Sequence, residues 1–231
     1  MIIGFSTGCL YKKYDVLSPK TIDFFRKAGC NAIELMVHDS YNRHQLKKLK
    51  ESDLQGFEYI SVHAPFLKKE ELGAYIKTLE VITDIHAKIK LDSVVLHPDM
   101  IEDFDFLKKF QLPYFVENMD NRKKSCKNVE DLQIVFEKFD VPMILDVNHC
   151  FSNDPTMKLA HDLVKAFGNR IKGYHLSGFT AFHEPLFMTK QTKIIDAIPD
   201  TSLPIIIESI LNSPKDISTE LEYIKAHLQR G

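Results

Sequence analysis

Short runs of apolar and β-branched residues alternate with longer segments of helical periodicity along the whole of this 231-residue chain. Several of the short runs are apolar at consecutive positions, which is typical of parallel strands covered on both faces. Eight such runs are predicted to be strands, at residues 2–6, 32–37, 59–64, 93–97, 114–118, 142–148, 171–176 and 204–209. Eight strands that alternate with eight helices in a chain of this length predict a (β/α)8 TIM barrel, with a doubly wound open sheet as the alternative.

Local signals favour the barrel. Ser18, Asn128 and Ser213 stand where helix starts are expected, since serine and asparagine side chains cap the first turn of a helix. A nucleotide-binding open sheet would carry a glycine-rich turn after its first strand, and residues 6–10 contain no G-x-G-x-x-G. We find no linker or low-complexity tract, so residues 1–231 are predicted to form a single domain.

Composition leaves small neutral or anionic metabolites open as partners. The formal net charge of -2 gives no general attraction to polyanions, which disfavours a nucleic-acid partner without excluding one. No apolar run approaches the roughly 18 residues of a membrane helix, and no signal peptide is recognised, so a cytoplasmic location without membrane contact is predicted. The four cysteines form no C-x-x-C pair and are predicted to be free thiols.

Titratable residues gather at the predicted carboxyl ends of the strands and in the loop after the seventh. The set comprises Glu34, His63, His97, Glu117, Asp146, His149, His175, His183 and Glu208. In a barrel these ends converge on one mouth, where the chemistry is placed. So many titratable groups are costly to bury without a cation, and imidazole with carboxylate suits Zn²⁺ or Mn²⁺. A site for one to three divalent ions is therefore predicted.

Other residues near the mouth are candidates for substrate contact. Glu34 could reach a substrate or form an ion pair with a lysine inside the barrel. Phe179 and Phe182, in the loop after the seventh strand, could close over a ligand. His38 is a candidate for the rim.

An ordered set of short motifs resembles the xylose-isomerase-like TIM-barrel superfamily, which holds sugar isomerases and epimerases and the endonuclease IV enzymes (AP endonuclease family 2). The motifs are His-Ala-Pro at 63–65, Leu-His-Pro at 96–98, Glu-Asn at 117–118, Asp-x-x-His at 146–149, His-Leu-Ser at 175–177 and Ile-Glu-Ser at 207–209. The resemblance covers essentially the whole chain. It implies a four-ligand metal site, made by Glu117, Asp146, His175 and Glu208.

The same resemblance implies further ligands. His63 and His97 match the residues that, with Glu117 as a bridge, bind a second ion in endonuclease IV. His149 and His183 match two of three ligands of a third ion in that family. The third of those ligands would be an aspartate two residues before His183, and Ala181 stands there instead.

Two enzymatic activities follow from the resemblance. As a metal-dependent sugar or sugar-phosphate isomerase or epimerase, the protein would act through an enediolate, with Glu117 and Glu208 as the acid/base pair. As an endonuclease-IV-like zinc phosphodiesterase, it would cleave abasic DNA. The chain lacks the arginine that epimerases usually carry just after the histidine at 175, and it also lacks recognisable DNA-gripping elements. The sugar enzyme is the main prediction, and a non-catalytic ligand-binding barrel is a third alternative.

Overall fold

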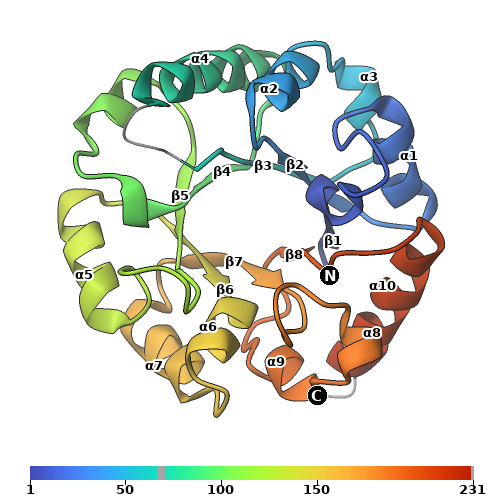
Figure 1. Ribbon diagram of the computed structural model, residues 1–231, viewed down its shortest axis with the longest axis vertical. Coiled ribbons are helices and arrows are strands. Elements are labelled where there is room, and N and C mark those ends of the chain that lie inside the picture. The colour runs from blue at the N-terminus through green and yellow to red at the C-terminus, as the bar shows by residue number, and fades with distance from the viewer. Residues whose placement is uncertain (67–70, 230–231) are drawn as a thin grey trace.

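Eight parallel strands close into a barrel in the computed structural model, which describes residues 1–66 and 71–229. The strands are β1 (Ile3–Ser6), β2 (Ala32–Met36), β3 (Tyr59–His63), β4 (Ser93–Leu96), β5 (Tyr114–Glu117), β6 (Met143–Asp146), β7 (Ile171–Leu176) and β8 (Ile205–Ile207). Each strand pairs with its sequence neighbours, and β8 pairs with β1. Figure 1 shows the helices as a ring around this barrel. The predicted (β/α)8 barrel is confirmed, and the open sheet is wrong.

Helices cover the outside of the barrel. The α-helices are α1 (Pro19–Lys27), α2 (Ser40–Leu46), α3 (Glu51–Leu54), α4 (Leu72–Ile89), α5 (Val129–Lys138), α6 (Val147–Asn153), α7 (Lys158–Phe167), α8 (Leu186–Thr189), α9 (Thr192–Asp196) and α10 (Lys215–Leu228). The predicted starts hold for α1 and α5. The Ser18 side chain accepts a hydrogen bond from the Thr21 N–H, and Asn128 accepts one from Asp131. None of the helices among the described residues has the length and apolar character needed to cross a membrane.

Two sequence predictions need correction. The strand predicted at 142–148 ends at Asp146, and α6 begins at the next residue because the Asp146 side chain accepts the His149 N–H and caps the helix. Between β4 and β5 the expected α-helix is replaced by two 3-10 helices, η3 (Pro98–Met100) and η4 (Asp105–Lys109). This connection is short and has a proline at either end. The buried Leu107 anchors it to the core.

The barrel interior is layered. Ala32, Tyr59 and Ile206 form a small apolar cluster on β2, β3 and β8. Because side chains on a strand alternate between its two faces, the residue two positions further on points the same way. Two residues beyond the apolar cluster are Glu34, Ser61 and Glu208. The barrel interior therefore changes from an apolar layer to a polar layer toward the carboxyl ends of the strands.

Close packing of strands also shapes the barrel wall. A Cβ added at Gly4 would lie 1.7 Å from the backbone oxygen of Ala32, so only glycine fits where β1 approaches β2. On the outer face of β1, Phe5 stacks on Phe25 of α1 at 5.6 Å. The inner face of the same strand carries Ser6, which opens onto the mouth.

Candidate metal centre

Histidine and acidic side chains come together at the carboxyl ends of the strands. Among the described residues, three groups have ligand atoms that all lie within 4.8 Å of one another. The groups are Glu117, Asp146, His175 and Glu208; His63, His97 and Glu117; and His63, His175 and Glu208. The structure thus brings together the four residues, and the three that share Glu117, which the family resemblance implied as ligands. This buried cluster is consistent with a divalent metal site.

Glu117, at the end of β5, is the hub of the cluster. Its Oε1 lies 2.8 Å from the Nδ1 of His175, and its Oε2 lies 2.8 Å from the Nε2 of His97 and 3.4 Å from that of His63. Burial opposes ionisation of this fully enclosed side chain, but His175 and the hydrogen bonds of the imidazoles hold its pKa well below the usual value. Glu117 is therefore an anion that can face two cations at once.

Asp146 has one oxygen engaged and one oxygen without a hydrogen bond. Its Oδ1 accepts the His149 N–H at 2.8 Å. Its Oδ2 is buried, has no hydrogen-bond partner among the described residues, and lies 3.4 Å from the His149 Nε2. Burial and the neighbouring Glu117 carboxylate raise the pKa of Asp146 well above its usual value. An unpaired buried carboxylate oxygen is costly unless a cation meets it, so this residue fits a divalent ion.

Asn118, next to Glu117, holds the end of β6 in place. Its side-chain oxygen accepts the Asp146 N–H at 2.8 Å, and its side-chain nitrogen donates to the Asp146 carbonyl at 3.0 Å. The amide thus replaces a missing strand partner and fixes the backbone of Asp146. The Glu-Asn pair in the sequence therefore has two roles, one for each residue.

The two other predicted metal histidines lie beside the cluster. His149 is 3.7 Å from Glu117 through Nδ1, and the Nδ1 of His183 is 2.9 Å from the Ser177 hydroxyl. Neither belongs to a candidate ligand group within the described part of the chain. Burial lowers the pKa of His183 to about 3 and that of His97 to about 4, so both rings are neutral at pH 7. A third ion remains a prediction from the resemblance.

Glu34 lies beneath the centre. It is fully buried, its Oε2 accepts the Ser61 hydroxyl at 3.0 Å, and the same oxygen is 3.2 Å from the Nε2 of His175. Glu34 thus forms an ion pair with this histidine, whereas the sequence suggested a substrate contact or a lysine. A carboxylate behind a metal-binding imidazole typically orients the ring.

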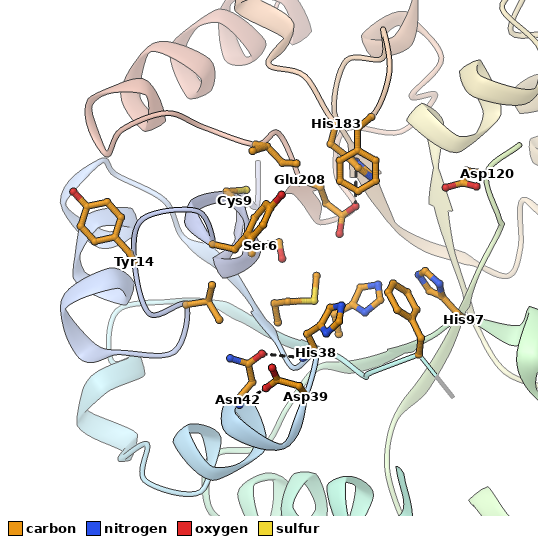
Figure 2. A pocket seen from close by; sticks show the side chains of 18 of the residues that line it. Ser6, Cys9, Tyr14, His38, Asp39, Asn42, His97, Asp120, His183 and Glu208 are labelled. Atoms are coloured by element: carbon orange, nitrogen blue, oxygen red, sulfur yellow. Dashed lines mark hydrogen bonds and ion pairs between the residues drawn. The ribbon is translucent and has the colours of Figure 1, made fainter. Parts of the chain in front are cut away.

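A cavity of about 670 Å³ opens above the cluster. Figure 2 shows His97, Asp120, His183 and Glu208 around one side of it. Phe182 lines the cavity, where a substrate contact was suggested from the sequence. Phe179 is not one of the described residues that line it and packs against Phe151 instead.

Sequence reasoning missed several lining residues. Asp120 and Arg122 follow Glu117 by three and five residues, so proximity to the motif was the available signal. The Asp120 carboxylate accepts a hydrogen bond from the Arg122 side chain at 2.8 Å. Ser6, at the end of β1, carried no recognisable motif.

Two phenylalanines cover the histidines of the mouth. The ring of Phe66 lies 4.6 Å from that of His97, and the Lys123 ammonium stands 5.0 Å above Phe66. On the other side, the ring centres of Phe182 and His183 lie 4.4 Å apart, and the Arg122 guanidinium carbon lies 4.5 Å from the centre of the Phe182 ring. These cation-π contacts reduce the freedom of both rings.

No family model and no curated protein matches this sequence, whereas solved structures match along nearly its full length. A 3-keto-D-glucoside 4-epimerase from E. coli superposes with a TM-score of 0.65 at 11% identity and covers 98% of this chain and 99% of its own. An L-ribulose 3-epimerase gives 0.64 at 14% identity, with 99% and 94% covered. A xylose isomerase domain containing protein from Salmonella typhimurium gives 0.65 at 12% identity, with 99% and 97% covered.

These matches define the class at the level of the fold. The protein has the (β/α)8 fold of xylose-isomerase-like TIM barrels, as the sequence motifs indicated. At the mouth of this barrel lies the His/Glu/Asp cluster described above.

Proposed function

We propose that this protein is a metal-dependent isomerase or epimerase of sugars or sugar phosphates. The observation that carries the proposal is the meeting of Glu117, Asp146, His175 and Glu208 within 4.8 Å under an open cavity. Structures named as sugar epimerases share the fold, which supports a sugar as the substrate class. The four residues would hold the ion, and His63 with His97 could hold a second one beside Glu117.

A bound divalent ion such as Zn²⁺ or Mn²⁺ supplies a Lewis acid next to the substrate oxygens. Glu208 lines the cavity and can exchange a proton with a substrate carbon. Burial, together with the carboxylates of Glu117 and Asp146, raises its pKa to about 7 despite the nearby His175. In the absence of an ion this carboxyl group is partly protonated at neutral pH, and a general acid/base must gain and lose a proton in that range.

Glu117 is the proposed second member of the acid/base pair. Its pKa is held low, so its environment differs from that of Glu208. Pairs of carboxyl groups whose pKa values are pushed apart are typical of sites that add a proton on one side and remove one on the other.

Solvent exchange tests the proposal. The protein loaded with Mn²⁺ is incubated with a panel of ketoses in D₂O, and NMR follows incorporation of deuterium at carbon. We expect exchange in the wild type and a loss of at least 100-fold in Glu208→Gln, compared at equal metal occupancy because Glu208 is also a proposed ligand. Glu222→Gln, on the exposed face of α10, is the matched control. Unchanged exchange in Glu208→Gln would remove Glu208 from the mechanism.

A phosphodiesterase is the second candidate, because His63, His97 and Glu117 form a second ligand group that shares Glu117. Paired ions bridged by a carboxylate are typical of enzymes that cleave phosphate esters. The test is cleavage of an abasic duplex oligonucleotide by protein that contains two Zn²⁺ per chain. Cleavage without ketose exchange would favour this function over the sugar enzyme, and absence of both activities would favour the non-catalytic barrel.

A further inference from the structure

The cavity continues away from the metal centre into a second half that the proposed reaction does not use. Figure 2 shows Tyr14 and Asn42 on the side of the cavity opposite His97 and Asp120. This half is built by residues 11–16, which follow the first strand, and by the residues around the start of α2. Its lining residues include Tyr11, Tyr14, Asp15, His38, Asp39, Tyr41 and Asn42.

The volume exceeds what one sugar ring needs. At about 670 Å³, the cavity lies within the range of roughly 300–1,000 Å³ that accommodates drug-sized ligands. A single ring placed against Glu208 leaves the half at Tyr14 unfilled. The substrate therefore has room for a second part of similar size.

The chemistry of the second half suits a neutral polyhydroxyl group. Tyr11 and Tyr41 are each 55% exposed, the Lys12 ammonium lies 6.0 Å from the centre of the Tyr11 ring, and the Asp15 carboxylate accepts the Tyr41 hydroxyl at 2.9 Å. Carboxylates form strong hydrogen bonds with hydroxyl groups. Aromatic faces with carboxylates beside them are therefore a fitting surface for a sugar ring.

Charge argues against an anionic group in this half. The lysine and arginine side chains of the described cavity lining are Arg122 and Lys123, and both belong to the metal side. Each is already paired, Arg122 with Asp120 and Lys123 with Asp99 at 3.1 Å. A phosphate near Asp15 would meet like charge, which is unfavourable.

Ser6 marks the junction between the halves. Its side chain is 1% exposed and lines the cavity, yet its hydroxyl has no hydrogen-bond partner among the residues described. In the barrel, Ser6 pairs with Glu34 on β2 and lies one residue beyond the pairing of β1 with Ile207, next to Glu208. An unpaired buried hydroxyl is costly, and a substrate hydroxyl beside the reacting carbons would satisfy it.

We propose that the second half is a sugar subsite and that the substrate is a glycoside of two rings. The reacting ring lies at Glu208 with a hydroxyl on Ser6, and the non-reacting ring lies over Tyr11 and Tyr41. This inference rests on the proposed sugar chemistry at the metal centre. Binding of the remote ring would then position the reacting ring.

Affinity for sugars of two sizes tests the subsite. Calorimetry on Mn²⁺-loaded protein compares maltose, cellobiose and lactose with glucose and galactose. We expect at least one disaccharide to bind tenfold or more tightly than its monosaccharides. Tyr11→Ala should remove this advantage and leave monosaccharide affinity unchanged, whereas Ser6→Ala should weaken both. Ile134→Ala, a similarly exposed apolar side chain on α5, should change neither.

The outcomes separate the subsite from the function. Equal affinity for one and two rings, an equal effect of Tyr11→Ala on both, or tighter binding of glucose 6-phosphate than of any disaccharide would overturn the subsite while the sugar function stands. Failure of every sugar to bind in a metal-dependent manner would overturn the proposed function itself. Circular dichroism of Tyr11→Ala establishes that the variant is folded.

Discussion

The Oε2 of Glu34 lies 3.2 Å from the Nε2 of His175, on the side of the ring away from Glu117. Both side chains are fully buried. Carboxylates at both ring nitrogens raise the pKa of His175 well above its usual value, although burial opposes this. An ion bound at Nδ1 would displace the proton there, while Glu34 would keep the proton on Nε2. Glu34 therefore sets the form in which His175 can bind an ion.

Replacing Glu34 should weaken metal binding. We expect Glu34→Gln to lower affinity for Zn²⁺ or Mn²⁺ by about 10–100-fold, because the ring loses its charged partner. Competition with a chromophoric chelator measures the affinity, and Glu222→Gln serves as the surface control. An unchanged affinity would mean that packing alone orients His175.

Metal affinity should rise with pH. Burial lowers the pKa of His63, but Glu117 and Glu34 outweigh it and raise the value to about 9, while that of Glu208 is raised to about 7. At pH 6 both groups hold protons that an ion must displace. We expect affinity to increase about tenfold per pH unit for each proton released, between pH 6 and 8. Calorimetry in buffers of different ionisation enthalpy counts these protons, and a flat profile would contradict the prediction.

Asn118→Ala should destabilise the barrel. The alanine leaves the N–H and the carbonyl of buried Asp146 unpaired, at a cost of about 2–4 kcal/mol in the free energy of unfolding. Urea denaturation of the metal-free protein measures the change. Asn212→Ala, in an exposed loop, should stay within about 0.5 kcal/mol of wild type. A comparably small loss in Asn118→Ala would show that the amide does not support β6.

The difference in the free energy of unfolding between wild type and Glu220→Gln should change with pH. Glu220 of α10 accepts the N–H groups of Leu186 and Phe187, and burial raises its pKa. Because the pKa of Glu220 is higher in the folded state than in the unfolded state, protonation of this group stabilises the folded protein. This contribution to the free energy of unfolding is fully present below about pH 4.3 and is lost as the pH rises through the folded-state pKa. The free energy of unfolding of the glutamine variant, measured by urea titration, should therefore increase relative to that of wild type as the pH rises from 4 to 7. A shift in the opposite direction would show that the two N–H donors dominate.

The strand order, and the position of most candidate ligands at one end of the barrel, could be predicted because both follow from periodicity and position. Glu117, His175 and Glu208 each end or follow an apolar run, and parallel strands bring such positions together. The contact between Glu34 and His175 could not be predicted. Strand alternation indicates which face of β2 carries Glu34, but not which side chain lies next to it inside the barrel. The helix that starts at Val147 was missed because an aspartate after an apolar run reads equally well as a strand residue or a cap.

The residues of the outer cavity carried little sequence signal for a different reason. Both Ser6 and Asp120 are recognised by their surroundings in the folded protein. The Ser6 hydroxyl has no hydrogen-bond partner among the described residues, and Asp120 accepts a hydrogen bond from Arg122. Such properties depend on contacts between distant segments, so a motif of neighbouring residues does not encode them.

Arg122 and Lys123 are consecutive residues, yet they rest on different rings, Phe182 and Phe66, on two sides of the mouth. One short stretch of backbone, at residues 122–123, therefore places a cation over each of the two rings that lie against His183 and His97. A shift of this backbone would change both contacts together, whereas rotation of either side chain would change one of them.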